Sequence, residues 1–264
     1  MSGPDRAGAR GSPDTPHPSV PRAPSTTDGP TGVILGIDTA TDWIVVGLAR
    51  PDGTQLRGGA LRALRMQGER LLRQVEGCLD SVGLTRSDIV GVVVGTGPGT
   101  FTGLRIGIAT AKGIAHGLGV PLVGVSTADV LREAILHDWT VPGFDPDAPP
   151  TDRPDVALLL PAGPQDRLLI HGQTVAIVPP GAEIGLPADT LLIAVDLAGR
   201  APEEAIQRGE SAVRGFAETL LTFGCRQLAA GDTDDLAEVV PEYVTLPRGV
   251  TRQTGEVAWS RDPR

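Results

Sequence analysis

The stretch that most constrains the fold runs from Ile89 to Gly117, because it joins an apolar strand, a glycine-rich loop and an apolar helix. Residues 89–94 are a nearly continuous β-branched run, typical of a strand buried on both faces. Residues 95–103 hold four glycines, and residues 104–115 have the periodicity of a helix. The stretch therefore predicts a strand, a turn and a helix that lies back on the sheet.

The predicted helix is apolar on nearly every side. Gly103, Gly107 and Ala111 recur every four residues, so one ridge has no large side chains and another backbone can approach it. Because each glycine inside a helix costs about 1 kcal/mol against alanine, this pattern indicates packing on two sides. One side is the chain's own sheet. The other is either a second element of this chain or a partner protein, and periodicity does not choose between them.

Glycines between a strand and a helix can direct backbone N–H groups at phosphate. The spacing here fits neither G-x-x-x-x-G-K-[ST] nor the third glycine of G-x-G-x-x-G. We therefore favour a structural role, in which glycine supplies the tight turn and Thr100 or Thr102 caps the helix.

Composition excludes several classes of protein. With 264 residues, 40% of them hydrophobic and 3% aromatic, the chain can bury one large aliphatic core or two modest ones. A net charge of −9 argues against a main nucleic-acid surface, so any RNA role needs a basic partner. Cys78 and Cys225 are few and far apart, which suits a reducing cytosol and excludes a cysteine zinc site. With no apolar run of 18 residues and no signal pattern, we expect a soluble, cytoplasmic protein without membrane contact.

The chain divides into four segments. Residues 1–31 hold seven prolines but no leucine or isoleucine, which predicts a disordered tail. Residues 32–137 form a first lobe and residues 156–264 a second. The segment between them, 138–155, is rich in proline and is predicted to be a linker or an insertion.

Both lobes are predicted to start with antiparallel strands and to continue with helix and strand. In the first lobe the strands are expected at 33–38, 43–48, 54–61, 89–94 and 120–125, with helices at 68–82 and 104–115 and a further one opening at 126. In the second lobe the strands are expected at 156–160, 168–170, 174–178, 191–195 and 227–230, with a helix at 203–223.

Few residues offer chemistry. Asp38 ends the first strand beside a turn, where a carboxylate either holds magnesium or, more commonly, accepts an Asx hydrogen bond. Ser126 has the spacing of a nucleophile elbow, but Asp129 three residues later makes a capped helix start the commoner interpretation. The four histidines lack the spacing of a metal site.

Three segments together resemble the TsaB (YeaZ) family: Gly-Ile-Asp-Thr-Ala-Thr at 36–41, Gly-Pro-Gly-Thr-Phe-Thr-Gly-Leu-Arg-Ile-Gly at 97–107 and Gly-Val-Ser-Thr at 124–127. The resemblance is close over Val33 to Leu136 and loose beyond, although residues 241–243 and 257–259 resemble the family's end. It implies an α/β fold of the actin, Hsp70 and sugar-kinase superfold, with two ribonuclease-H-like lobes of which the second is reduced.

The resemblance also implies a non-catalytic subunit in synthesis of N6-threonylcarbamoyladenosine at position 37 of tRNA. Family members pair with the paralogue TsaD, which carries the metal, and work with the ATPase TsaE, so tRNA is met only through the complex. The family's partner contact is a bundle formed by the helices matching 68–82 and 104–116. The interface residues so implied are Leu72, Val75, Leu79, Gly103, Arg105, Gly107, Ala111 and Lys112.

No catalytic residue, metal or cofactor is expected in the isolated chain. ATP or ADP is expected at the interface of the complex, with Asp38, Thr39 and Thr41 as the candidate nucleotide loop. A homodimer stays open, and so does an alternative class: an autonomous nucleotide-binding or M22 peptidase-like enzyme of the same superfold.

The chain departs from the family pattern in both lobes. Where the family often has His-Ser-Glu, this chain has Gln67-Gly68-Glu69, which keeps only the glutamate. Where the family's second lobe has Asp-Ala-Arg and Glu-Val-Tyr, this chain has Pro161-Ala162-Gly163 and Arg167-Leu168-Leu169.

Overall fold

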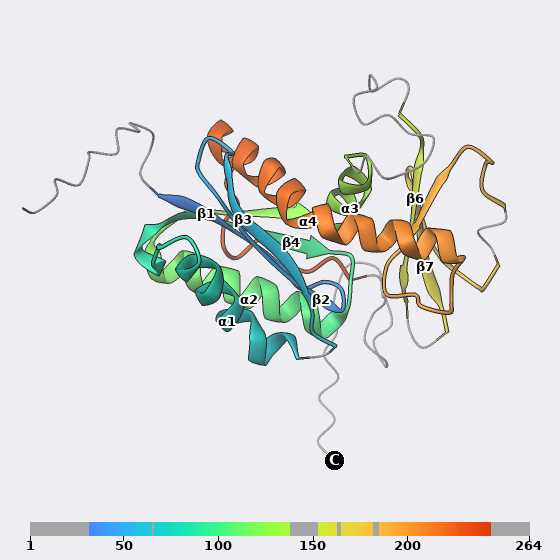
Figure 1. Ribbon diagram of the computed structural model, residues 1–264, viewed down its shortest axis with the longest axis horizontal. Helices are drawn as coiled ribbons and strands as arrows, with labels where there is room; N and C mark the ends of the chain where they lie inside the picture. The colour runs from blue at the N-terminus through green and yellow to red at the C-terminus, as the bar shows by residue number, and fades with distance from the viewer. Residues whose placement is uncertain (1–31, 65, 138–152, 163–164, 182–184, 244–264) are drawn as a thin grey trace, which may run out of the picture.

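The computed structural model describes residues 32–64, 66–137, 153–162, 165–181 and 185–243. They form two mixed sheets, with one long helix running across both (Figure 1). The predicted tail at 1–31, most of the proline-rich segment 138–155 and the family-like end at 257–259 lie outside the described residues.

The first sheet has the strand order β3-β2-β1-β4-β5, and its strands match the prediction closely. They are β1 (Val33–Asp38), β2 (Trp43–Ala49), β3 (Gln55–Arg62), β4 (Ile89–Gly97) and β5 (Leu122–Ser126). The first three are antiparallel, whereas β4 and β5 run parallel to β1. The central strand β4 is buried on both faces, as its valine run predicts: Val92 and Val94 pack in one apolar cluster, and Val93 packs in the other.

Helices cover both faces of this sheet. Helices α1 (Gln67–Asp80) and α2 (Phe101–Leu118) lie on one face, and α4 (Glu203–Ala230) lies on the other (Figure 1). A short 3₁₀ turn, η1 (Arg86–Asp88), leads into β4. The helices predicted at 68–82 and 104–115 are confirmed, but α2 begins three residues earlier than expected because most of the glycine-rich stretch belongs to β4 or to α2 itself.

The second sheet repeats the first with one strand fewer. Its strands are β6 (Val156–Pro161), β7 (Arg167–His171), β8 (Thr174–Val178) and β9 (Leu191–Ala194), in the order β8-β7-β6-β9. Again three antiparallel strands are followed by a parallel one. The predicted α/β fold with two ribonuclease-H-like lobes, the second reduced, is therefore confirmed.

Helix α4 is longer than expected and absorbs the strand predicted at 227–230, which was wrong. Its last turns stay helical because they pack against the first sheet. The Gly224 backbone lies on Val93, and Leu228 lies on Gly91. The helix ends at Gly231, which takes a left-handed conformation. Because α4 packs on both sheets, a single apolar cluster extends through both lobes.

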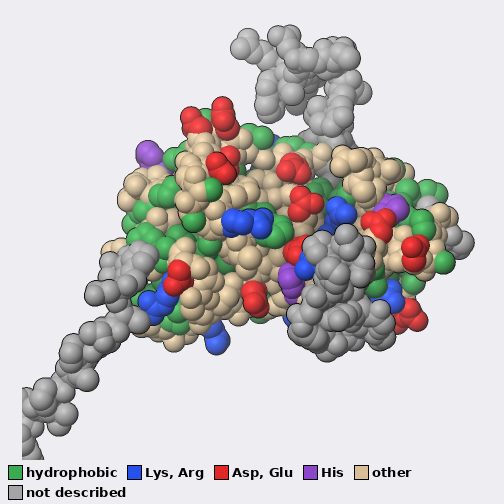
Figure 2. Space-filling model, turned by 90° about the horizontal axis from the view of Figure 1, so that it is seen from above, with side chains coloured by type: hydrophobic (Ala, Val, Ile, Leu, Met, Phe, Trp, Pro, Cys, Tyr) green, Lys and Arg blue, Asp and Glu red, His purple; other side chains and the backbone are tan. Residues whose placement is uncertain are grey.

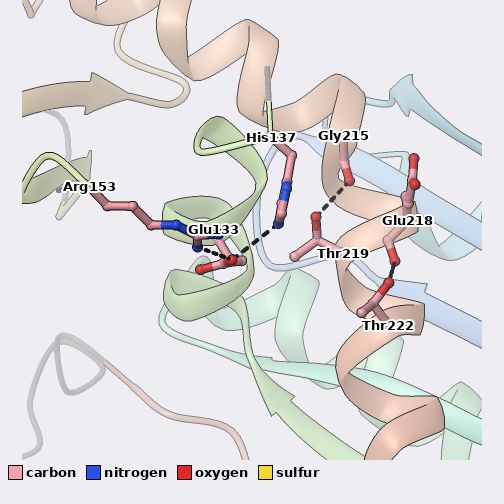
Figure 3. A network of polar contacts seen from close by, with 7 residues as sticks. All are labelled: Glu133, His137, Arg153, Gly215, Glu218, Thr219 and Thr222. Atoms are coloured by element: carbon pink, nitrogen blue, oxygen red, sulfur yellow. Dashed lines mark hydrogen bonds and ion pairs between the residues drawn. The ribbon is translucent and has the colours of Figure 1, made fainter. Parts of the chain in front are cut away.

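Helix α3 (Thr127–Ile135) packs against α4 and begins as predicted. The Asp129 N–H donates to Ser126 Oγ (3.3 Å), so the serine is a helix cap. At the other end of α3, the Glu133 carboxylate is bonded to His137 Nε2 (3.1 Å) and to Arg153 Nη1 (3.0 Å), as Figure 3 shows. The residues that flank segment 138–152 thus meet at one carboxylate.

On the face shown in Figure 2, the basic side chains are scattered among acidic and uncharged ones and form no continuous patch. Among the described residues, no helix is long and apolar enough to cross a membrane.

Candidate functional site: the groove between α1 and α2

The glycine-rich motif packs α2 directly on the Asp38–Asp42 turn, which joins β1 to β2. Thr39 Oγ1 donates a hydrogen bond to Gly103 O (2.7 Å). A Cβ atom added to Gly103 would collide with Thr39 O, and one added to Gly107 would collide with Thr39 Oγ1. Glycine is therefore required here for a close approach of two backbones rather than for binding phosphate.

Thr100 occupies the N-cap position of α2, but its side chain makes no capping hydrogen bond. Its backbone N–H instead donates to Ala40 O in the same turn (2.6 Å). Thr102 lies inside the first turn of the helix. The predicted threonine cap was wrong: the side chain at the N-cap makes no capping bond, and the start of α2 is held instead by a backbone contact to a distant turn.

Most of the predicted interface residues are buried within this chain. Leu79, Gly103, Gly107 and Ala111 are enclosed by the chain's own sheet and turn, which leaves these four little surface to offer a partner. Their spacing reflects packing on the first lobe. Val75 is also buried, although it contributes to the floor of the surface groove described below.

Asp38 is enclosed at the end of β1, with its side chain 1% exposed. The Ala40 N–H donates to Asp38 Oδ1 (2.8 Å), which confirms the Asx interpretation, and Thr127 Oγ1 donates to Oδ2 (2.6 Å). Burial raises the pKa of Asp38 to about 6, although both hydrogen bonds act in the opposite direction. Gly95 leaves the room this carboxylate needs, since a Cβ there would overlap it.

The three residues predicted to bind nucleotide do lie together, but the turn encloses them. Thr39 is 1% exposed and Thr41 is 5% exposed, and Thr41 O accepts from Gln67 Nε2 of α1 (3.2 Å). Asp38, Thr39 and Thr41 therefore bond within the chain and present no open surface to a nucleotide.

An open groove lies instead on the outer side of the two helices, and we call it the α1/α2 groove. It has a volume of about 450 Å³ and is lined mainly by Leu72, Val75, Ile89, Gly113, Ile114 and Leu118. Leu72 is 52% exposed and Leu118 is 38% exposed, so both contribute to one exposed apolar patch. Glu76 and Arg86 form an ion pair at its edge.

The groove residues on α2 were missed, although the sequence contained their signal. Thr110, Gly113, Ile114 and Gly117 follow the spacing of one helix face, and all four line the groove. A Cβ added to Gly113 or Gly117 would meet nothing, so these glycines leave the groove open. The repeat from Gly103 to Ala111 lies on the opposite face of the helix.

Arg105 and Lys112 do not line the groove. Arg105 lies near the start of α2, where its guanidinium stacks on the Phe101 ring (3.8 Å) and its Nε donates to Tyr243 Oη (2.8 Å). It thereby fastens the segment after α4 to α2. Lys112 is partly exposed.

No group of three or more His, Cys, Asp and Glu side chains converges within the described part of the chain in a way that could hold a metal. His137 and His171 each pair with a carboxylate, of Glu133 and Asp155 respectively.

Comparison with known proteins finds similar proteins by sequence and by structure. Residues 62–174 match the family model for TsaD, described as tRNA N6-adenosine threonylcarbamoyltransferase. The Escherichia coli tRNA threonylcarbamoyladenosine biosynthesis protein TsaB is 44% identical over 94 residues, which is 36% of this chain and 40% of that protein. The solved structure of YeaZ from Pseudomonas aeruginosa matches 80% of this chain and 99% of its own, with a TM-score of 0.59 and 23% identity. The chain is TsaB/YeaZ-like.

The likeness in sequence is partial. An uncharacterised Mycobacterium tuberculosis protein is 38% identical over 109 residues, covering 41% of this chain and 52% of that protein. The chain thus spans about half the length of the curated relatives it matches, or less.

Proposed function

We propose that this chain is a non-catalytic subunit in the biosynthesis of tRNA N6-threonylcarbamoyladenosine, and that it binds and activates a TsaD-like catalytic subunit through the α1/α2 groove. The observation that carries the proposal is the groove itself: an open apolar surface with half-exposed Leu72, on a chain that is TsaB/YeaZ-like. Exposed apolar patches of this kind are typical of protein-binding sites.

The shape of the groove suits a helical partner. It runs between α1 and α2, and two glycines of α2, Gly113 and Gly117, leave room in it for side chains from outside. A helix pair with apolar residues three and four apart would fill it and form a bundle. A second copy of this chain presents the same surface, so a homodimer is the competing occupant.

Two features favour a subunit over an autonomous enzyme. The turn that a nucleotide-binding relative would use is filled by the chain's own helices around Asp38 and Thr39. The net charge of −9 favours contact with tRNA through the complex rather than by this chain alone. In this proposal a TsaE-like ATPase joins the complex, ATP or ADP binds at its interface, and the assembly works in the cytoplasm.

Reconstitution tests the proposal. The full chain is combined with the TsaD-like and TsaE-like proteins of the same organism, and formation of the modified nucleoside on tRNA is measured together with the affinity for the TsaD-like protein. We expect Leu72→Glu to weaken binding at least tenfold, because a carboxylate would be desolvated in the groove. The matched control is Ile177→Glu, on an equally exposed apolar residue of β8 in the second lobe, which should change neither quantity.

Modification that proceeds equally well without this chain would overturn the subunit role. Metal-dependent hydrolysis of ATP or peptide by the chain alone, lost in Asp38→Ala, would favour the enzyme instead.

A further inference from the structure

Neither helix that borders the groove is fixed at its start by a side-chain cap. The N-cap residues Met66 of α1 and Thr100 of α2 make no side-chain capping bond. Helix starts without such partners need another source of order. Here the starts of both helices are held by the same segment, the Asp38–Asp42 turn.

The turn holds each helix by its own hydrogen bond. Gln67, the first residue of α1, is 4% exposed and donates through Nε2 to Thr41 O (3.2 Å). On α2, Gly103 O accepts from Thr39 Oγ1 (2.7 Å). A shift of this turn therefore moves the starts of both helices and with them the walls of the α1/α2 groove.

The far end of the turn is held by the second lobe. The Asp42 N–H donates to Asp196 Oδ2 (2.6 Å), across 154 positions of sequence. Asp196 directly follows the end of the second sheet at β9 and Val195. The Asp42 carbonyl accepts from Ala63 N (2.8 Å) and Leu64 N (3.4 Å), at the end of β3.

The two residues that clamp Asp42 are both in unusual backbone conformations. Asp196 has φ +57° and Leu64 has φ +41°, and within the described ranges no other non-glycine residue has a positive φ. Such conformations persist only when the surrounding structure enforces them, and they concentrate where position matters. Both converge here on the backbone of one residue.

The carboxylate of Asp196 is also largely removed from solvent. Burial, and after it the neighbouring charge of Asp42, raise the pKa of Asp196 to about 6, while the Asp42 N–H, Arg62 and Trp43 act in the opposite direction. Arg62 stacks on the Trp43 ring (5.8 Å) beside it. A carboxylate that is desolvated yet bonded to the Asp42 N–H suggests that its role is to position that backbone.

We propose that Asp196 is a positioning residue through which the second lobe sets the Asp38–Asp42 turn, and through the turn the placement of α1 and α2. The relevance to partner binding rests on the function proposed above, whereas the coupling between the lobes does not. In this view the reduced second lobe aligns the docking groove of the first.

Three variants separate the hydrogen bond from the backbone conformation. Asp196→Asn keeps both an acceptor oxygen and a residue that tolerates positive φ. Asp196→Gly keeps the conformation but removes the acceptor. Leu64→Gly is the matched control, because it relieves a positive φ on the other side of Asp42 and removes only an exposed side chain.

Amide hydrogen exchange of the free full chain, followed by NMR, measures the coupling between the second lobe and the two helices. We expect Asp196→Gly to raise exchange at least tenfold at Asp42 and in the first turns of α1 and α2, with Asp196→Asn within about threefold of the parent and Leu64→Gly unchanged. Faster exchange confined to β9 and the start of α4 would show a merely local role and overturn the proposal.

Affinity for the TsaD-like protein is measured on the same variants. We expect Asp196→Gly to weaken binding about tenfold and Asp196→Asn to retain it. If exchange spreads to both helices while Leu72→Glu leaves binding intact, the coupling stands and the proposed docking function falls.

Discussion

The two sides of α2 use the same residue type for opposite purposes. On the inner side, Gly103 and Gly107 lie against Thr39, and there is no room for even one added carbon. On the outer side, Gly113 and Gly117 border the α1/α2 groove, and an added carbon would meet nothing. The comparison teaches that a glycine within a helix can serve either internal packing or an open surface, and that only the neighbouring element decides which.

The largest expected effect is on the inner side. Gly107→Leu should lower the free energy of unfolding by about 4 kcal/mol, from overpacking and from loss of the buried bond between Thr39 and Gly103. Denaturant unfolding followed by circular dichroism measures it. Gly113→Leu, on the outer side of the same helix, is the control and should not lower stability, because an added Cβ meets no neighbour and leucine favours the helix over glycine. Equal stability of the two variants would contradict the assignment of the two sides.

This expectation shows what the sequence could and could not predict. Periodicity predicted α2, its lack of a polar face and its packing on two sides, because those properties are local. It did not show that the Gly103 to Ala111 ridge meets Thr39, since that contact joins positions 64 residues apart. The sequence likewise left Asp38 with two alternatives, a magnesium ligand or an Asx acceptor. Its burial depends on Thr127 and Gly95, which lie on other elements.

The second lobe illustrates the same limit. Its strands were found from their apolar runs, yet the helical state of residues 227–230 depends on contact of α4 with the first sheet, which no local pattern reports. Asp196 carried no sequence signal at all. Its role arises from a hydrogen bond to the turn of the other lobe.

Stability should also depend on pH, because the Asp38 carboxylate is buried beside the turn on the inner side of α2. The pKa of Asp38 is about 6 in the folded chain, against 3.8 for an unperturbed aspartate, so the folded state binds the proton more tightly. Stability from this residue is therefore fully present below about pH 3.8 and is lost as pH rises through about 6, by on the order of 3 kcal/mol.

Asp38→Asn removes that titration and keeps the acceptor for Ala40 N–H. The stability of the variant relative to the parent should therefore rise by about 2 kcal/mol between pH 4 and pH 7. The difference cancels the titration of Asp196, which both proteins share. A difference that is flat with pH would mean that Asp38 is not desolvated as described.

The outer side should respond in binding rather than in stability. Gly113→Leu places a side chain in the α1/α2 groove and should weaken binding of the TsaD-like protein at least tenfold, or about 1.4 kcal/mol. Isothermal titration calorimetry measures the affinity. Unaltered affinity, with the variant folded as the parent is, would place the partner elsewhere on the surface.

The smallest expected effect is the sharpest test of the comparison, because it uses one methyl group on each side. Gly113→Ala should stabilise the chain by about 0.5 to 1 kcal/mol, since alanine favours the helix and its Cβ meets no neighbour. Gly107→Ala gains the same helix propensity but drives its Cβ into Thr39 Oγ1, so its net effect should be destabilising. Opposite signs of the two changes in unfolding free energy support the distinction. If both alanines stabilise the chain, Thr39 can move aside, and the inner contact does not require glycine.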